Sequence, residues 1–231
     1  MAEEVIRTVA VTKNYRLGRS VIHALRGVSF KVTPSEFLSI VGPSGSGKTT
    51  LLNLLGALDL PTSGKVFLDG VDLTQVPERK LYAVRRNKVG FVFQHFYLIQ
   101  TLTTIENVLV PVLPVKNNKQ FRKRAEELLS TIGLKERMTH KPNQLSGGEQ
   151  QRVAVCRALI NNPKVLFCDE ITGELDSATG EKIIGLLQKI NQIEGVTTIF
   201  VTHDPTVSSK TDRTITLEDG KITSDKSSSN P

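Results

Sequence analysis

The sequence contains little cysteine and no long apolar run, and each shortage excludes a class of protein. Only two of the 231 residues are cysteine, Cys156 and Cys168, so a disulfide framework is excluded and free thiols in a reducing compartment are expected. No apolar stretch reaches the ~18 residues that a membrane-spanning helix needs, and the first four residues, Met-Ala-Glu-Glu, do not resemble a signal peptide. We therefore expect a cytoplasmic chain without a membrane span of its own.

Basic residues exceed acidic ones in this chain. Thirty Lys and Arg against 23 Asp and Glu give a formal net charge of +7 at pH 7, which favours an anionic partner such as a nucleotide, a nucleic acid or a lipid surface. The densest basic cluster is Lys116, Lys119, Arg122, Lys123 and Arg124. A solvated helix face is the first interpretation of this cluster, contact with lipid headgroups the second, and nucleic acid the third.

Short apolar runs alternate with longer helical patterns along the chain. The runs at 28–32, 37–41, 66–68, 89–93, 165–168 and 196–201 predict strands, and the patterns at 48–57, 121–132 and 183–190 predict helices. This alternation predicts an α/β fold with a mainly parallel sheet. The early strands and a late hairpin around Asp219-Gly220 predict an added antiparallel β portion. Helical patterns dominate residues 121–160 and predict an α-helical insert.

Two further segments differ from the rest in composition. Residues 224–231 are polar and rich in serine, which predicts a disordered tail. Residues 89–115 carry one formal charge, Glu106, and four of the 12 aromatic residues of the chain. Ordinary core is one interpretation of this second segment, and a partly exposed apolar docking surface is the other.

Residues 42–49 match G-x-x-x-x-G-K-[ST], the pattern of a phosphate-binding loop, between a predicted strand and a predicted helix. Glycines let backbone N–H groups turn toward phosphate oxygens, and the start of the following helix carries a partial positive charge. Lys48 is placed to reach the β- and γ-phosphates, and the Thr49 hydroxyl to ligate Mg²⁺. The predicted nucleotide-binding residues here are Gly42, Pro43, Ser44, Gly45, Ser46, Gly47, Lys48, Thr49 and Thr50.

Two carboxylates end a later apolar strand. Asp169 and Glu170 directly follow the apolar residues 165–168. We predict that such an acid pair lies beside the phosphate loop, with Asp169 holding Mg²⁺ and Glu170 polarising the attacking water as general base. Taken alone, the two acids would also fit a solvated strand end.

Residues 145–152, Leu-Ser-Gly-Gly-Glu-Gln-Gln-Arg, contain a helix-start signal. Ser146 and Glu149 have the spacing of a capping box, which predicts a helix running toward Ile160. The N–H groups of Gly147 and Gly148 at such a start suit a phosphate. A helix start without a ligand is the alternative interpretation, and both can hold together.

The same residues 145–152 resemble the signature motif of ABC ATPases. With the phosphate loop and the Asp-Glu pair, the chain resembles an ABC nucleotide-binding subunit over residues 5–223. The resemblance implies an α/β P-loop NTPase core with an inserted helical subdomain, ATP and Mg²⁺ as cofactors, and ATP hydrolysis as the reaction. It further implies that Tyr15 stacks on adenine, that Gln94 links Mg²⁺ and water to the helical subdomain, and that His203 senses the γ-phosphate. The implied catalytic residues are Glu170, His203 and Gln94, and the implied Mg²⁺ ligands are Thr49, Gln94 and Asp169.

The resemblance also implies a second copy of the chain. Ser146, Gly147 and Gly148 would complete the nucleotide site of the partner, so that two copies hold two ATP molecules head to tail. Asp176 matches the loop that crosses this dimer interface. The other histidines, His23, His95 and His140, have no metal-ligand spacing and are interpreted as structural or surface residues.

Three residues depart from the common pattern of the family. Glu149 stands where Gln is usual, and a capping box accepts either residue. Ile171 stands where Pro commonly follows the catalytic Glu, which would loosen the backbone there. Glu174 stands where Ser or Ala is typical and would add negative charge near the interface. These departures bear on turnover and dimer affinity rather than on the chemistry.

Several stretches are similar to the macrolide-exporter and lipoprotein-release type: residues 85–94, 102–108 and 140–148. That group implies a membrane permease as partner, a position on the inner face of the membrane, and export, extraction or mechanotransmission as the role. A cell-division-type signalling ATPase and a soluble non-transport ABC ATPase are the alternatives, and nucleic acid is not expected as a partner. The predicted division is a nucleotide-binding core (1–93 and 163–223), a helical subdomain (94–162) and the tail (224–231).

Overall fold

A six-stranded sheet forms the centre of the computed structural model, which describes residues 4–18, 20–113 and 119–227. Its order is β11-β10-β4-β9-β8-β7, and all neighbouring strands are parallel except β10 and β11. The strands are β4 (Phe37–Val41), β7 (Val89–Phe93), β8 (Val165–Asp169), β9 (Thr197–Thr202), β10 (Arg213–Glu218) and β11 (Lys221–Ser227). The predicted α/β class with a mainly parallel sheet is confirmed.

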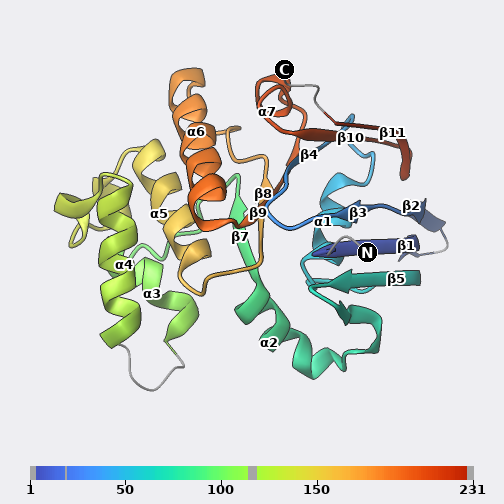
Figure 1. Cartoon of the computed structure of the whole chain (residues 1–231), viewed down its shortest axis with the longest axis horizontal. Helices are drawn as coiled ribbons and strands as arrows, with labels where there is room; N and C mark the ends of the chain where they lie inside the picture. The colour runs from blue at the N-terminus through green and yellow to red at the C-terminus, as the bar shows by residue number, and fades with distance from the viewer. Residues whose placement is uncertain (1–3, 19, 114–118, 228–231) are drawn as a thin grey trace.

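A second, antiparallel sheet lies beside α1 (Lys48–Leu55), and Figure 1 shows it on the right. Its strands are β1 (Ile6–Leu17), β2 (Ser20–Val28), β3 (Lys31–Val32), β5 (Ser63–Leu68) and β6 (Val71–Asp72). The single strand predicted over 28–32 is wrong, because the chain leaves β2 at Val28. At the break the Ala10 N–H donates to the Ser29 side chain at 2.7 Å rather than to a backbone carbonyl.

The remaining helices gather on one side of the central sheet (Figure 1) or border it. The α-helices are α2 (Glu78–Lys88), α3 (Thr104–Leu109), α4 (Lys119–Thr131), α5 (Gly147–Leu159), α6 (Ser177–Glu194) and α7 (Pro205–Ser208). The 3-10 turns are η1 (Leu73–Gln75), η2 (Val110–Val112), η3 (Lys135–Arg137) and η4 (Pro142–Gln144). In Figure 1 the helices α3, α4 and α5 lie together, at the left of the view.

Both faces of the central sheet are buried, as its continuous apolar strands require. Leu166 and Cys168 of β8 pack into one cluster with α3, α4, α5 and α6, whereas Phe167 packs into the other with α1 and the antiparallel sheet. Both cysteines are free and fully buried, and burial raises the pKa of each thiol. In the described ranges no helix is both long and apolar enough to cross a membrane.

The predicted disorder of residues 224–231 is wrong for its first four residues. Residues 224–227 continue β11, and the hairpin turn that leads into it has Asp219 at φ +46° and Gly220 at φ +75°, a pair typical of type I′ turns. Asp225 anchors the strand, because its carboxylate accepts two hydrogen bonds of 2.6 Å from the Arg213 guanidinium. Composition does not reveal such a partner in another strand. Residues 228–231 lie outside the described residues.

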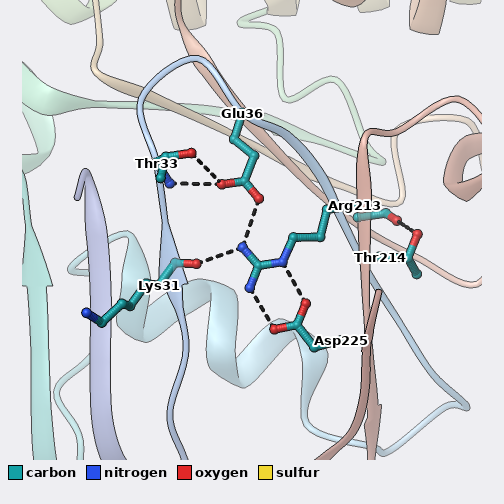
Figure 2. Close-up of polar contacts among 7 residues, drawn as sticks. Lys31, Thr33, Glu36, Arg213, Thr214 and Asp225 are labelled. Carbon is teal, nitrogen blue, oxygen red and sulfur yellow. Dashed lines mark hydrogen bonds and ion pairs between the residues drawn. The ribbon is translucent and has the colours of Figure 1, made fainter. Parts of the chain in front are cut away.

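Arg213 joins three parts of the fold, as Figure 2 shows. Besides Asp225 on β11, its guanidinium donates to Glu36 Oε1 and to the Lys31 carbonyl, each at 2.9 Å. The second oxygen of Glu36 accepts from the backbone and side chain of Thr33. The hydrogen bonds that the guanidinium donates to Asp225 and Glu36 raise the pKa of Arg213 against the opposing effect of burial. The guanidinium therefore fastens β10, β11 and the turn before β4 to one another.

Replacing Arg213 by methionine is expected to lower the free energy of unfolding by about 2 kcal/mol, because Glu36 and Asp225 lose a shared charged partner. Chemical denaturation followed by circular dichroism measures this difference. Lys226→Met on the same hairpin is the control, since Lys226 is an exposed side chain of β11. Equal stabilities of the two variants would contradict the role given to Arg213.

Candidate functional site

The phosphate loop joins β4 to α1 in the predicted place and is closely packed. Gly42 has φ +155°, and a Cβ there would lie 2.0 Å from the Leu217 carbonyl oxygen. Gly47 has φ +101°, and a Cβ there would lie 2.5 Å from the Ala24 carbonyl oxygen. No side chain caps the start of α1. The first N–H groups of this helix are therefore available for an anion.

Lys48 lies inside this loop with 8% of its surface exposed. Its ammonium group donates to the carbonyl oxygens of Gly42 at 2.8 Å and Pro43 at 2.9 Å. Ser46 Oγ is buried and has no hydrogen-bond partner among the described residues. A buried hydroxyl and a buried ammonium at one loop are costly unless they bind polar groups, and phosphate oxygens would satisfy both.

Asp169 ends β8, between β7 and β9, and Glu170 follows it. Glu170 has φ +49°, a left-handed conformation that is uncommon for residues other than glycine and frequent at functional sites. Its carboxylate accepts from Thr202 Oγ1 at 3.2 Å and lies 2.8 Å from His203 Nδ1. The turn after β8 thus directs Glu170 toward the end of β9.

Asp169 has the properties of a cation ligand. Its Oδ1 atom is buried and has no hydrogen-bond partner in the described part of the chain. Burial raises the pKa of this carboxyl and the charge of Glu170 raises it further, while Lys48 lowers it. A divalent cation would compensate the buried negative charge, and carboxylate and hydroxyl oxygens are ligands that Mg²⁺ prefers. The residues present therefore fit Mg²⁺.

A cavity of about 440 Å³ brings the loop and the ends of three strands together. Gln94 enters it from the end of β7, with its carboxamide so close to Gly173 that a Cβ there would lie 2.9 Å from Nε2. The residues that line the cavity are Ser44, Gly45, Lys48, Thr49, Gln94, Glu170 and His203. The structure thus unites predicted residues from four separate parts of the chain.

Tyr15 lies outside this cavity, on β1, with 38% of its surface exposed. Its hydroxyl donates to Asp59 Oδ2 at 3.1 Å, and Lys13 donates to the other oxygen of Asp59 at 2.7 Å. Asp59 was not singled out from the sequence, because it belongs to no motif. Its contacts fix the phenol end of Tyr15 and leave the ring partly open to solvent.

The signature residues also lie outside the cavity. The predicted capping box is confirmed, since Ser146 Oγ accepts from the Glu149 N–H at 3.3 Å and Glu149 accepts from the Ser146 N–H at 2.8 Å. That bond from Ser146 is the main reason why the pKa of Glu149 is lowered. Ser146 is exposed. Asp176 caps the start of α6, because its Oδ1 accepts from the Thr179 N–H at 3.0 Å. Hydrogen bonds from the Thr179 side chain and from this N–H lower the pKa of Asp176.

The three departures from the common family pattern each have a local partner. Glu149 pairs with Arg137 at 3.4 Å, a contact that a neutral glutamine could not make as an ion pair. Ile171 is buried, so packing restrains the backbone that the missing proline was expected to loosen. The Glu174 carboxylate contacts Nδ1 of His95, a residue that the sequence predicts to be structural or on the surface.

A Gly-rich loop at the end of a central parallel strand, facing an Asp-Glu pair at the end of a neighbouring strand, defines a P-loop nucleoside triphosphatase. The ABC transporter family model matches residues 25–173. The chain belongs to the ABC transporter family and is an ATP-binding subunit whose reaction is ATP hydrolysis. Such subunits of transporters associate with a membrane.

Relatives agree with this assignment and with the predicted subfamily. The chain is 48% identical to the ABC transporter ATP-binding protein MJ0796 of Methanocaldococcus jannaschii, over 94% of both chains. It is 49% identical to the lipoprotein-releasing system ATP-binding protein LolD of Aquifex aeolicus, over 86% of this chain and 88% of LolD. It is 47% identical to the macrolide export ATP-binding/permease protein MacB of Syntrophobacter fumaroxidans, over 95% of this chain but 31% of MacB.

A solved structure shares the fold over nearly the whole chain. The dimeric structure of a post-hydrolysis state of the MJ0796 cassette, bound to ADP and Pi, matches with a TM-score of 0.88 and 44% identity. The match covers 98% of this chain and 100% of that one.

Proposed function

We propose that two copies of this chain close on two Mg·ATP molecules at the inner face of a membrane and drive a separate permease subunit in export, extraction or mechanotransmission. The observation that carries the proposal is the cavity that gathers Lys48, Gln94, Glu170 and His203 while the signature residues lie outside it. A nucleotide in that cavity leaves its outer side free for Ser146–Gly148 of a second copy. The dimeric MJ0796 structure supports this arrangement.

Nucleotide binding uses the loop and the ring of Tyr15. The adenine stacks on Tyr15, whose hydroxyl is held by Asp59. Residues 42–50 surround the phosphates with N–H groups, and Lys48 exchanges two carbonyl partners for phosphate oxygens. Thr49, Gln94 and Asp169 are the residues that would hold Mg²⁺, which when bound neutralises charge on the transferred phosphoryl group.

Hydrolysis is carried by the pair at the ends of β8 and β9. Glu170 accepts the proton of the attacking water as general base, and Thr202 holds its second oxygen in place. His203, hydrogen-bonded to Glu170 through Nδ1, keeps its other ring nitrogen free for the γ-phosphate. Ser146, Gly147 and Gly148 of the second copy add donors where charge develops, and Asp176 shapes the loop between the two copies.

Replacing Asp169 by asparagine is expected to have opposite effects on stability and activity. Because the folded-state pKa of Asp169 is raised, its contribution to stability falls as pH rises from the unfolded-state pKa through the folded-state pKa, so the ionised group destabilises the ligand-free fold at pH 7. The variant should therefore melt at a higher temperature in EDTA, and the gain should shrink toward pH 4.

Its hydrolysis rate should fall by about 100-fold or more, since a ligand of the metal is lost. Differential scanning calorimetry and phosphate release measure the two effects. Asp204→Asn, which changes the carboxyl that caps the start of α7, is the control for stability. A D169N protein that melts lower than the wild type in EDTA would contradict the account.

The permease is proposed to dock on a second cavity of about 550 Å³ beside α2 and α5. Val92 and Val108 are core residues, as the first interpretation of residues 89–115 predicts, whereas Tyr97 is 63% exposed and lines this cavity, which supports the docking interpretation. Pro114 and Val115 lie outside the described residues. Apolar side chains dominate the lining: Leu58, Val89, Phe91, Phe93, Tyr97, Val110 and Pro111. An exposed apolar depression next to Gln94 suits a helix of a membrane subunit.

Replacing Tyr97 by alanine is expected to reduce permease-stimulated ATP hydrolysis by about tenfold, because a large apolar contact is lost. Hydrolysis by the isolated chain should stay within about twofold of wild type. The assay compares the rate with and without the permease in detergent. Tyr82→Ala is the matched control, since Tyr82 is 59% exposed and outside the cavity. Equal stimulation of both variants would place the docking site elsewhere.

Affinity capture from detergent-solubilised membranes tests the proposed function as a whole. We expect an integral membrane protein to be recovered and to stimulate ATP hydrolysis. If no integral membrane protein is recovered, the result would favour the alternative of a soluble non-transport ABC ATPase. Nucleic-acid binding that weakens steeply with salt would support that alternative. Against it, Arg122 and Arg124 pair with Glu126 and Glu194, and Lys116 lies outside the described residues. Substrate flux in reconstituted vesicles separates transport from cell-division-type signalling.

The division of the chain is part of the same proposal. Residues 1–93 and 163–223 form the nucleotide-binding core, and 94–162 form a helical subdomain that carries the signature. The position of α3, α4 and α5 on one side of the central sheet supports it (Figure 1).

A further inference from the structure

Gln151 lies in the second turn of α5 and is fully buried. Its Nε2 group donates one hydrogen bond to the Ile171 carbonyl at 3.0 Å and one to the Phe93 carbonyl at 3.3 Å. Both N–H bonds of the carboxamide are therefore used. Its Oε1 atom is buried without a partner among the described residues. Burying the unpaired Oε1 atom costs free energy, and the two hydrogen bonds that Nε2 donates offset this cost and hold the side chain in place.

The two accepting carbonyls belong to residues that are adjacent in sequence to Gln94 and Glu170. Phe93 is the last residue of β7 and directly precedes Gln94. Ile171 directly follows Glu170, which has the left-handed conformation described above. The carboxamide of Gln151 thus fixes both the backbone just before Gln94 and the backbone just after Glu170.

A second side chain of α5 donates hydrogen bonds to the segment that follows Gln94. Arg157, six residues further along α5, donates to the Phe96 carbonyl at 2.8 Å and to the Tyr97 carbonyl at 2.5 Å. Burial lowers the pKa of this guanidinium. Helix α5 therefore holds the backbone from Phe93 to Tyr97, and through Gln151 it also holds the loop that follows Glu170.

We propose that Gln151 is a positioning residue that couples the two nucleotide sites of the dimer within one chain. The inference rests on the proposed function, in which the start of α5 binds the nucleotide of the second copy. When Ser146–Gly148 engage that nucleotide, α5 shifts as a rigid helix. Through its two hydrogen bonds, Gln151 carries the shift to Gln94 and Glu170 in the nucleotide site of its own chain. That site is therefore completed only when the nucleotide site of the second copy is occupied.

The test compares Q151M with Q150M in steady-state ATP hydrolysis by the full chain. Methionine keeps the length of the side chain and removes both donors. Gln150, the neighbouring residue, is the matched control, because its side chain donates to the Leu145 carbonyl at 3.2 Å and to neither Phe93 nor Ile171. We expect Q151M to lose about tenfold or more in kcat, with KM for ATP within about twofold and the Hill coefficient reduced from above 1 to near 1. Q150M should keep the wild-type Hill coefficient.

A second measurement separates this inference from the proposed function. The double variant E170Q/Q151M should still form a dimer with Mg·ATP in light scattering, since its phosphate loop and signature are intact. Failure of the wild-type chain and of E170Q to dimerise would overturn the proposed function. A dimerising chain in which Q151M and Q150M share kcat and Hill coefficient would overturn the role of Gln151 alone.

A conservative variant covers the case in which Q151M does not fold. Q151N keeps a carboxamide that is one methylene shorter and reaches at most one of the two carbonyls. The kcat and the Hill coefficient of Q151N should lie between those measured for Q150M and those expected for Q151M, and Q151N should still bind ATP. If neither variant folds, as shown by thermal melting, Gln151 is a determinant of the fold and the positioning role is overturned.

Discussion

Replacing Glu170 by glutamine is expected to lower the rate of ATP hydrolysis by about 100-fold or more while ATP still binds. Glutamine has nearly the same shape and can accept from Thr202, but it cannot take a proton from the attacking water. The structure places no second carboxylate in the cavity lining that could replace it. Phosphate release at saturating ATP measures the rate, and fluorescence titration with a labelled ATP analogue measures binding.

Glu127→Gln is the control for this variant, because Glu127 is an exposed carboxylate of α4 and does not line the cavity. We expect Glu127→Gln to hydrolyse ATP at the wild-type rate. A rate for E170Q within about threefold of wild type would show that another group acts as the base.

The second large effect is expected on replacing Lys48 by alanine, which should weaken ATP binding by about 30-fold or more. Lys48 is a buried cation at the phosphate loop, and its carbonyl partners Gly42 and Pro43 are neutral. The β- and γ-phosphates would therefore lose their nearest charged contact. Calorimetric titration with a non-hydrolysable ATP analogue measures the change.

Lys80→Ala, at an exposed position of α2, is the control and should bind the analogue as the wild type does. An unchanged dissociation constant for K48A, with the fold intact by circular dichroism, would mean that the nucleotide does not occupy the cavity as we propose.

The sequence predicts those parts of the site whose residues lie within a few positions of one another along the chain. The phosphate loop lies between β4 and α1 because glycine, an apolar run and a helix pattern all occur within residues 37–55. The capping box at Ser146 is confirmed for the same reason, since its two partners are three residues apart. A run that is apolar at every position predicts a strand buried on both faces, and β8 is such a strand.

Interactions between distant residues could not be predicted in this way. The ion pair of Arg213 with Asp225 extends β11 into a segment whose composition indicates disorder. The residue type of Glu170 does not reveal its left-handed backbone conformation. The partner of Glu174 is a histidine that follows a different strand, so its identity depends on the fold. Gln151 looks like any polar residue of a helix until the fold places two carbonyls beside it.

The mass of E170Q in the presence of Mg·ATP tests the central claim most directly. The account predicts that light scattering coupled to size-exclusion chromatography gives twice the 25.4 kDa of one chain, and that with Mg·ADP the mass returns to that of one chain. An E170Q protein that binds ATP and still elutes at the mass of a single chain at saturating nucleotide would contradict the composite site formed by two copies.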